Sequence, residues 1–145
     1  MHVLSWHQVD FAGVVLVGLT AGYVMAITGL WAGAVPGLVA FDIADFGRRY
    51  MVSDRPSAWL LGFASHLVNS ILLVLVWAML IVPNLPWPRP LVGIAWGVFL
   101  AGGLIVPLSG LGFMGRKAGG LRFAATTLLL HALWGLVIGL LYTGS

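Results

Sequence analysis

The sequence contains no cysteine and no glutamate, and only 8% of its 145 residues are charged. The absence of cysteine excludes disulfides, thiolate metal sites and thiol catalysis. Seven Lys and Arg residues and four Asp residues are too few to cover a surface that faces water. Because 61% of the residues are hydrophobic and the mean hydropathy is +1.05, the composition predicts a single-domain integral membrane protein.

Four apolar stretches are long enough to be membrane-spanning helices, which predicts an all-α fold. They cover about residues 11–33, 57–82, 91–114 and 121–142. At ~1.5 Å per residue, each stretch can cross a hydrocarbon core of ~30 Å. The proline-rich turn at residues 83–90 makes the second and third spans antiparallel. Pro107 is expected to kink the third span.

The segment at about residues 38–47 differs from these spans. Its apolar residues partly share one helical face, and Asp42 and Asp45 lie away from that face. We therefore expect a short helix in the membrane interface, with the two aspartates as solvated charges that balance neighbouring arginines.

The basic residues predict how the helices are oriented. Six of the seven lie in the first and third loops: Arg48, Arg49, Arg55, Arg116, Lys117 and Arg122. The second loop carries only Arg89, and the termini carry none. The positive-inside rule places the first and third loops in the cytoplasm and both termini outside, and the expected location is the bacterial inner membrane. Basic residues placed in this way indicate membrane topology and not nucleic-acid binding.

Matching residues recur in the two halves of the chain. Gly18 and Gly22 match Gly93 and Gly97, and His66, Ser70 and Trp77 match His131, Gly135 and Tyr142. The pattern predicts an integral membrane four-helix bundle built from two repeated helical hairpins. Each histidine lies about nine residues from the start of its span, at a depth of ~13 Å from the inner boundary.

The two histidines at matching depth are the candidate site. A histidine inside a membrane span is costly to place and is a functional candidate. The second and fourth helices of an up-down-up-down bundle are diagonal, so His66 and His131 can hold the iron of one b-type haem between them. Gly22, Gly102 and Gly103 lie near the level where the porphyrin needs space. The arrangement is similar to membrane cytochromes b, where histidines on diagonal helices hold haem and glycines on the intervening helices make room for it.

Two other interpretations of the histidines stay open. Each can be a neutral packing residue that hydrogen-bonds within the bundle. The partners expected for His66 are Asn69, Ser65 or a threonine, and those for His131 are Thr127 or a backbone carbonyl. The histidines can also belong to a path for protons or a small solute.

Over nearly its full length, the chain resembles a bacterial family of small four-helix membrane proteins of unknown function. The resemblance rests on the glycine-rich first span, Phe41-Asp42-Ile43-Ala44, the histidine-bearing second span, the proline turn, Gly110-Leu111-Gly112-Phe113, and His131-Ala132-Leu133-Trp134-Gly135 followed by Tyr142. It implies that the histidines and glycines belong to a recurring design, and it implies no activity.

The function classes can be narrowed further. An enzyme is not expected, because the chain has no glutamate, no cysteine, no nucleotide-binding loop and no carboxylate inside a span. A chain with almost no mass outside the bilayer is expected to act with larger membrane subunits, and its glycine and aromatic faces suit docking. We therefore expect an accessory membrane subunit of a respiratory or photosynthetic electron-transfer complex with one b-type haem. The alternatives are a cofactor-free scaffolding or assembly subunit and a small proton or solute transporter.

Overall fold

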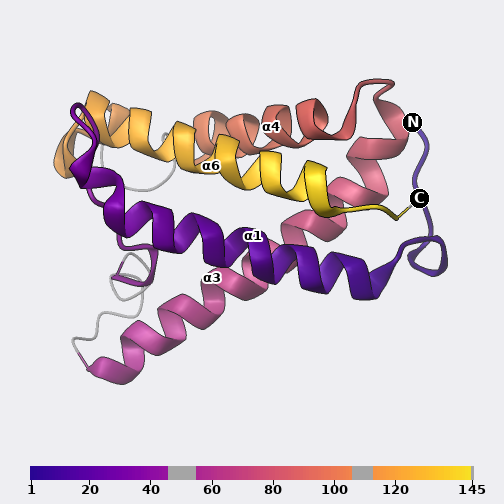
Figure 1. Cartoon of the computed structure of the whole chain (residues 1–145), viewed down its shortest axis with the longest axis horizontal. Helices are drawn as coiled ribbons and strands as arrows, with labels where there is room; N and C mark the ends of the chain where they lie inside the picture. Colours follow the sequence, from indigo (N-terminus) through magenta and orange to yellow (C-terminus); the bar gives the residue numbers. More distant parts are fainter. Residues whose placement is uncertain (46–54, 106–112, 145) are drawn as a thin grey trace.

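The computed structural model describes residues 1–45, 55–105 and 113–144, and every regular element in these ranges is helical. The longer helices there are α1 (Phe11–Trp31), α3 (Pro56–Val76), α4 (Arg89–Phe99) and α6 (Leu121–Leu141) (Figure 1). α1 packs against α3 and α6, and α4 packs against α6. α3 and α6 are thus held together mainly through α1, and the N-terminal half of α3 diverges from the other helices (Figure 1).

Among the described residues, three helical stretches are long and apolar enough to cross a membrane. They are Phe11–Ala34, Pro56–Asn84 and Leu121–Leu141, with mean hydropathies of 2.0, 2.2 and 1.9. The apolar helix Arg89–Gly103 is shorter. Part of the predicted span at 91–114, with the kink expected at Pro107, falls on residues 106–112, which lie outside the described residues.

Local sequence explains where the long helices begin. Asp10 caps α1, because its Oδ1 accepts a hydrogen bond of 2.9 Å from the Gly13 N–H. α3 begins with Pro56, whose missing N–H costs nothing in the first turn of a helix. α6 follows Gly119 and Gly120, which have φ values of +114° and +60° that glycine adopts without strain.

The short helical elements extend or connect the long helices. α3 continues as a π turn, η3 (Trp77–Ile81), and a 3-10 turn, η4 (Val82–Asn84). α4 likewise continues as a π turn, η5 (Leu100–Ile105). The remaining 3-10 turns of the described chain are η1 (Trp6–Gln8), η2 (Ala32–Ala34) and η6 (Phe113–Ala118).

Both termini lie at the same end of the molecule, beside the turn between α3 and α4 (Figure 1). The His2 N–H donates to Asn84 Oδ1 at 2.7 Å, and the Leu4 N–H donates to the Met79 carbonyl at 3.1 Å. At the other terminus, Arg89 Nη1 donates to the Tyr142 carbonyl at 3.1 Å. These bonds fix the two chain ends to the α3–α4 turn.

Glycines on α1 allow this helix to cross α3 closely. A Cβ atom at Gly18 would lie 2.7 Å from the Cα of Ile71, which real side chains do not tolerate. A Cβ at Gly22 would lie 3.0 Å from the Cβ of Ser70. Small residues at such a crossing permit the close backbone approach that membrane helices use for association.

α4 and α6 approach each other in the same way. A Cβ at Gly93 would collide with the carbonyl oxygen of Gly135, and a Cβ at Gly97 would collide with that of His131. On α6, a Cβ at Gly139 would lie 2.5 Å from the Arg89 carbonyl oxygen. The backbones of these two helices are therefore in direct contact over several turns.

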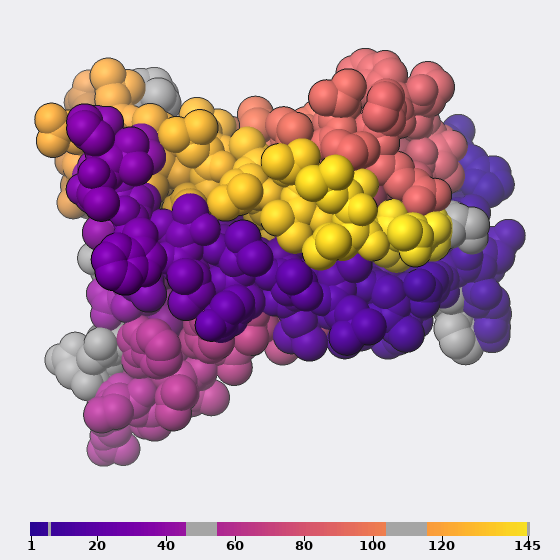
Figure 2. All heavy atoms as spheres, viewed as in Figure 1, coloured from indigo at the N-terminus to yellow at the C-terminus, as the bar shows by residue number. Residues whose placement is uncertain are grey.

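The helices bury a core of large side chains and also carry large apolar side chains on their outer faces. Val14, Val74, Trp77 and Ile138 are fully buried. On the outside, the exposed fractions reach 66% for Leu16, 62% for Leu60, 73% for Leu121 and 61% for Leu140. Figure 2 shows one such face, formed by α1 and α6 side by side. An apolar exterior around internally hydrogen-bonded helices is what a hydrocarbon environment requires.

The segment after α1 folds back over the end of the helices. Gly37 has φ +90°, and the chain then returns so that the Phe41 N–H donates to the Gly29 carbonyl at 2.9 Å. The Val39 N–H donates to Thr126 Oγ1 at 3.0 Å. Because these N–H groups bond to α1 and α6 and not within a helical turn, the helix expected over residues 38–47 begins only at Ile43. Residues 46 and 47 lie outside the described residues.

Asp42 anchors this returning segment to α3. Its Oδ1 accepts from the Ala44 N–H at 2.9 Å, and its Oδ2 accepts from Trp59 Nε1 at 2.9 Å. Asp42 is half-buried. The carboxylate predicted to be a solvated charge therefore caps a short helical turn and ties it to the neighbouring helix.

Candidate functional site

His66 and His131 occupy corresponding positions in two helices of equal length. α3 and α6 each contain 21 residues, and in each helix ten residues precede the histidine and ten follow it. At ~1.5 Å per residue, each imidazole lies ~15 Å from either end of its helix. For His131 this is about the midplane of a ~30 Å hydrocarbon core. His66 lies nearer the start of its spanning stretch, because that stretch continues through η3 and η4 to Asn84.

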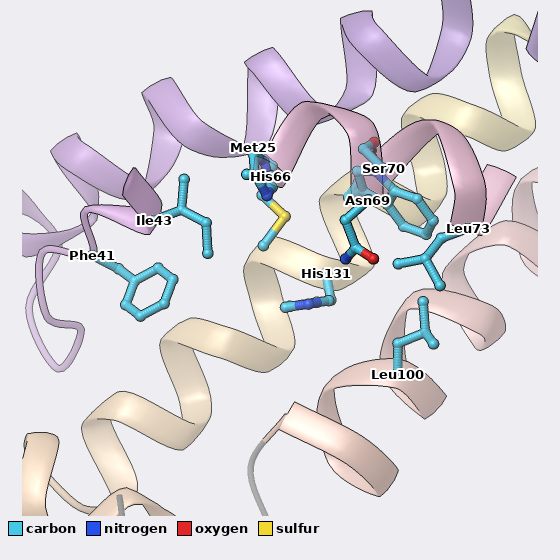
Figure 3. A pocket seen from close by; sticks show the side chains of 10 residues that line it. Met25, Phe41, Ile43, His66, Asn69, Ser70, Leu73, Leu100 and His131 are labelled. Carbon is cyan, nitrogen blue, oxygen red and sulfur yellow. Dashed lines mark hydrogen bonds between the residues drawn. The ribbon is translucent and has the colours of Figure 1, made fainter. Parts of the chain in front are cut away.

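Both histidines line one cavity of about 70 Å³ between the helices (Figure 3). Its other polar lining residues are Asn69, Ser70 and Trp134, and its apolar lining residues are Met25, Phe41, Ile43, Leu73 and Leu100. Since a water molecule needs ~10–15 Å³ of such space, the cavity has room for a few waters. Phe41 and Ile43 come from the returning segment, so that segment forms one wall of the site.

His66 connects α3 to α1. Its Nε2 lies 3.0 Å from the carbonyl oxygen of Gly22. A carbonyl can only accept, so Nε2 carries the hydrogen and Nδ1 of the neutral ring is unprotonated. The partner is thus neither Asn69 nor Ser65, and the Ser65 hydroxyl donates instead to the Leu61 carbonyl at 2.7 Å.

His131 bonds within its own helix. Its Nδ1 lies 2.8 Å from the Thr127 carbonyl oxygen, so Nδ1 carries the hydrogen. Its Nε2 is then the unprotonated nitrogen of the neutral ring. The Thr127 hydroxyl is buried and has no hydrogen-bond partner in the described part of the chain.

Ser70 connects three helices through its side chain. Its hydroxyl donates to the Gly18 carbonyl at 2.7 Å and accepts from Trp134 Nε1 at 2.7 Å. This connection was not predicted from the sequence. The spacing of these residues could have indicated it. Ser70 lies four residues after His66, and Trp134 lies three residues after His131, so each lies on the face of its helix that carries the histidine.

Asn69 supplies an open polar group to the cavity. Figure 3 shows its carboxamide in the same space as the His131 ring. The carboxamide has two donor hydrogens and an acceptor oxygen, and it makes no hydrogen bond within the described residues. Asn69 is an exposed residue that also lines the cavity, so its carboxamide is accessible to a group that enters there. The cavity can therefore take up water or a small polar group.

The histidines fit a haem unequally. A ligating histidine usually donates its second ring N–H to a carbonyl or carboxylate, as His131 does to Thr127, and leaves the other nitrogen for the metal. Nε2 of His66 is instead taken by the Gly22 carbonyl. Gly22 itself leaves no room for a flat ligand, because a Cβ there would already lie 3.1 Å from Leu67 Cδ2.

The other residues predicted to make room for haem lie apart from the cavity. A Cβ at Gly102 would make an ordinary contact of 3.8 Å with Leu128, and one at Gly103 a contact of 3.6 Å with the Phe99 ring. Neither glycine lines the cavity. A space of about 70 Å³ is much smaller than a porphyrin. As arranged, the residues can provide one axial ligand to a haem iron, His131. For His66 to provide the second ligand, the His66–Gly22 bond would have to open and α1 would have to separate from α3.

Neither a metal cluster among the described residues nor a match to a known protein identifies the function. The described residues contain no cluster of three or more His, Cys, Asp or Glu that could hold a metal ion. No known protein family, curated protein or solved structure matches the chain. The function is therefore inferred from the cavity and from the outer faces of the helices.

Proposed function

We propose that this protein is an accessory subunit of a larger membrane assembly. In this proposal it lies in the bacterial inner membrane as a four-helix bundle, with both termini outside and the first and third loops in the cytoplasm. The observation that carries the proposal is the exposure of large apolar side chains along helices that are long enough to span the bilayer. The placement of both termini at one end of the molecule is consistent with this topology.

Two equivalent sets of glycine contacts support a bundle of two repeated hairpins. Gly18 and Gly22 on α1 meet α3, and Gly93 and Gly97 on α4 meet α6. In both hairpins, the glycine-bearing helix comes first and packs on the helix that carries the central histidine. Duplication of one hairpin accounts for this correspondence.

The outer face of α4 is the docking surface that we propose for the larger subunit. Leu91, Ala95 and Val98 follow one another at helical spacing on α4, and they line an apolar groove together with Trp87, which precedes the helix. Trp87 is 57% exposed and Leu91 is 55% exposed. A transmembrane helix of a partner can pack into such a groove by van der Waals contact with its small and aromatic residues.

Purification in mild detergent tests the accessory role. The tagged chain is expected to co-purify in fixed stoichiometry with a larger membrane protein. Ala95→Trp, which fills the α4 groove, is expected to release that partner, whereas Leu16→Trp on the exposed face of α1 is expected to retain it. A wild-type chain that purifies alone would contradict the proposal, and substrate flux through liposomes that contain this chain alone would favour the predicted transporter.

Electron transfer is a second candidate function. It is favoured by the two imidazoles that line one cavity and by the free Nε2 of His131. The cavity of about 70 Å³ does not hold a porphyrin, so a b-type haem would enter only if the His66–Gly22 bond opened and α1 separated from α3. In that state the haem would supply one-electron redox chemistry, and the host assembly would be a respiratory or photosynthetic complex. The part of this chain would be to provide the His131 ligand and to keep its ring oriented through the Thr127 carbonyl.

A reduced-minus-oxidised spectrum of the protein, isolated with its partners, tests this second function. A b-type α-band is expected in the wild type, a complete loss in His131→Ala and a weakened or shifted band in His66→Ala. Ser65→Ala is the control, because the Ser65 hydroxyl donates to the Leu61 carbonyl of the same helix and Ser65 does not line the cavity. A featureless wild-type spectrum would remove electron transfer and leave a cofactor-free scaffolding subunit.

A further inference from the structure

A second groove lies between the C-terminal end of α1 and the first half of α6, on the face seen in Figure 2. We call it the α1–α6 groove. Its volume is about 270 Å³, and its lining is almost entirely apolar. Its lining residues are Thr28, Trp31, Ala32, Leu129 and Leu133, together with Val35, Leu38, Thr126 and Leu130.

Arg122 lies one helical turn before Thr126, which lines this groove near the start of α6. Arg122, Thr126, Leu129 and Leu133 are spaced at i, i+4, i+7 and i+11, so they lie along one stripe of α6. Side chains of a helix lean toward its N-terminus, which directs Arg122 away from the groove floor toward the end of the helix. The groove therefore has an exposed cation at its mouth and an apolar floor beyond it.

The positive charge at this end is not neutralised within the described chain. Arg116, Lys117 and Arg122 are all exposed, and none of them forms an ion pair with a described residue. Asp42 of the returning segment is engaged by the N–H groups of Ala44 and Asp45 and by Trp59. A guanidinium with free donors binds a phosphate with two parallel hydrogen bonds.

The dimensions of the stripe match one leaflet of a bilayer. Eleven residues separate Arg122 from Leu133, which corresponds to ~16 Å along α6. Half of a ~30 Å hydrocarbon core is ~15 Å. Trp31, which is 72% exposed, lies on the rim of the groove, and an exposed Trp is typical of the headgroup level.

We propose that the α1–α6 groove binds an anionic phospholipid. The lipid phosphate pairs with Arg122, and one acyl chain lies along Leu129 and Leu133. Arg116 and Lys117 lie close to Arg122 in the sequence, and they attract a second negative charge. The charge distribution selects an anionic headgroup over a zwitterionic one, because each nearby Lys or Arg contributes about fivefold to the affinity for an anionic lipid. The site is independent of the partner subunit and of haem.

Native mass spectrometry of delipidated protein in mild detergent tests the site. Phosphatidylglycerol and phosphatidylcholine with identical acyl chains are added at equal concentration. The wild type is expected to retain phosphatidylglycerol preferentially. Arg122→Gln is expected to weaken phosphatidylglycerol binding about fivefold and Arg122→Lys to preserve most of it, because the lysine keeps the charge.

A second pair of variants tests the apolar half of the site. Leu129→Trp fills the groove and is expected to lower phosphatidylglycerol binding without a change in charge. Leu140→Trp is the matched control, because Leu140 is 61% exposed on the same helix and does not line the groove. Circular dichroism verifies that each variant is folded. Equal retention of the two lipids by the wild type, or unchanged binding by Arg122→Gln, would overturn the proposal.

Discussion

Gly97→Ala is expected to force α4 away from α6 and to lower the free energy of unfolding by about 1–3 kcal/mol. The added Cβ would collide with the His131 carbonyl oxygen, and a backbone atom in the middle of a helix cannot move aside as a flexible side chain can. Thermal unfolding in detergent, followed by circular dichroism, measures the loss. Since the obstructed carbonyl belongs to His131, the same variant is expected to displace one wall of the cavity.

Gly102→Ala is the matched control on the same stretch of chain. Its Cβ would make only a 3.8 Å contact with Leu128, so its stability is expected to remain within about 0.5 kcal/mol of the wild type. Equal stability of the two variants would show that the backbones of α4 and α6 are not in the contact described above.

Trp134→Ala is expected to lower the free energy of unfolding by about 3–5 kcal/mol. The Trp134 side chain is only 2% exposed, so its removal leaves a large void beside the cavity. Trp134→Phe keeps most of the ring volume and removes the Nε1–H group, which donates a hydrogen bond to Ser70 Oγ. Its expected loss is about 1 kcal/mol, which is typical of a hydrogen bond between membrane helices.

The same unfolding measurement separates packing from hydrogen bonding in this pair of variants. Trp87→Ala serves as the control, because Trp87 is 57% exposed and its removal opens no internal void. Its expected effect on the isolated protein is within about 0.5 kcal/mol. If Trp134→Phe proved as destabilising as Trp134→Ala, the bond to Ser70 and not the volume of the ring would be the main contribution.

The helical architecture could be predicted because its signals are local. Apolar runs of more than twenty residues indicate spanning helices wherever they occur, and Pro56 and the pair Gly119 and Gly120 mark helix starts in the sequence itself. The return of residues 38–42 could not be predicted in this way. It depends on a hydrogen bond between Val39 and Thr126, which are 87 residues apart.

The candidate site was likewise predictable from the sequence only where the signal was local. The depth of His66 and His131 in their helices follows from counting residues, and both do line one cavity. Their hydrogen-bond partners did not follow, because His66 bonds to a backbone carbonyl at Gly22, and every residue carries such a group. The spacing of Gly22 equally suits a porphyrin and a close helix crossing, and only the position of α3 shows that a helix occupies that side.

The bonds around Ser70 restrict how charge can move through the molecule. The sequence of donors runs from the Trp134 indole to the Ser70 hydroxyl and ends at the Gly18 carbonyl. A Grotthuss chain needs a group that releases a proton at one end and a group that captures it at the other, and neither an indole nor an amide carbonyl does so near neutral pH. These three groups hold α1, α3 and α6 together and do not relay a proton. A proton that crosses this protein therefore has to follow a path that does not include Ser70.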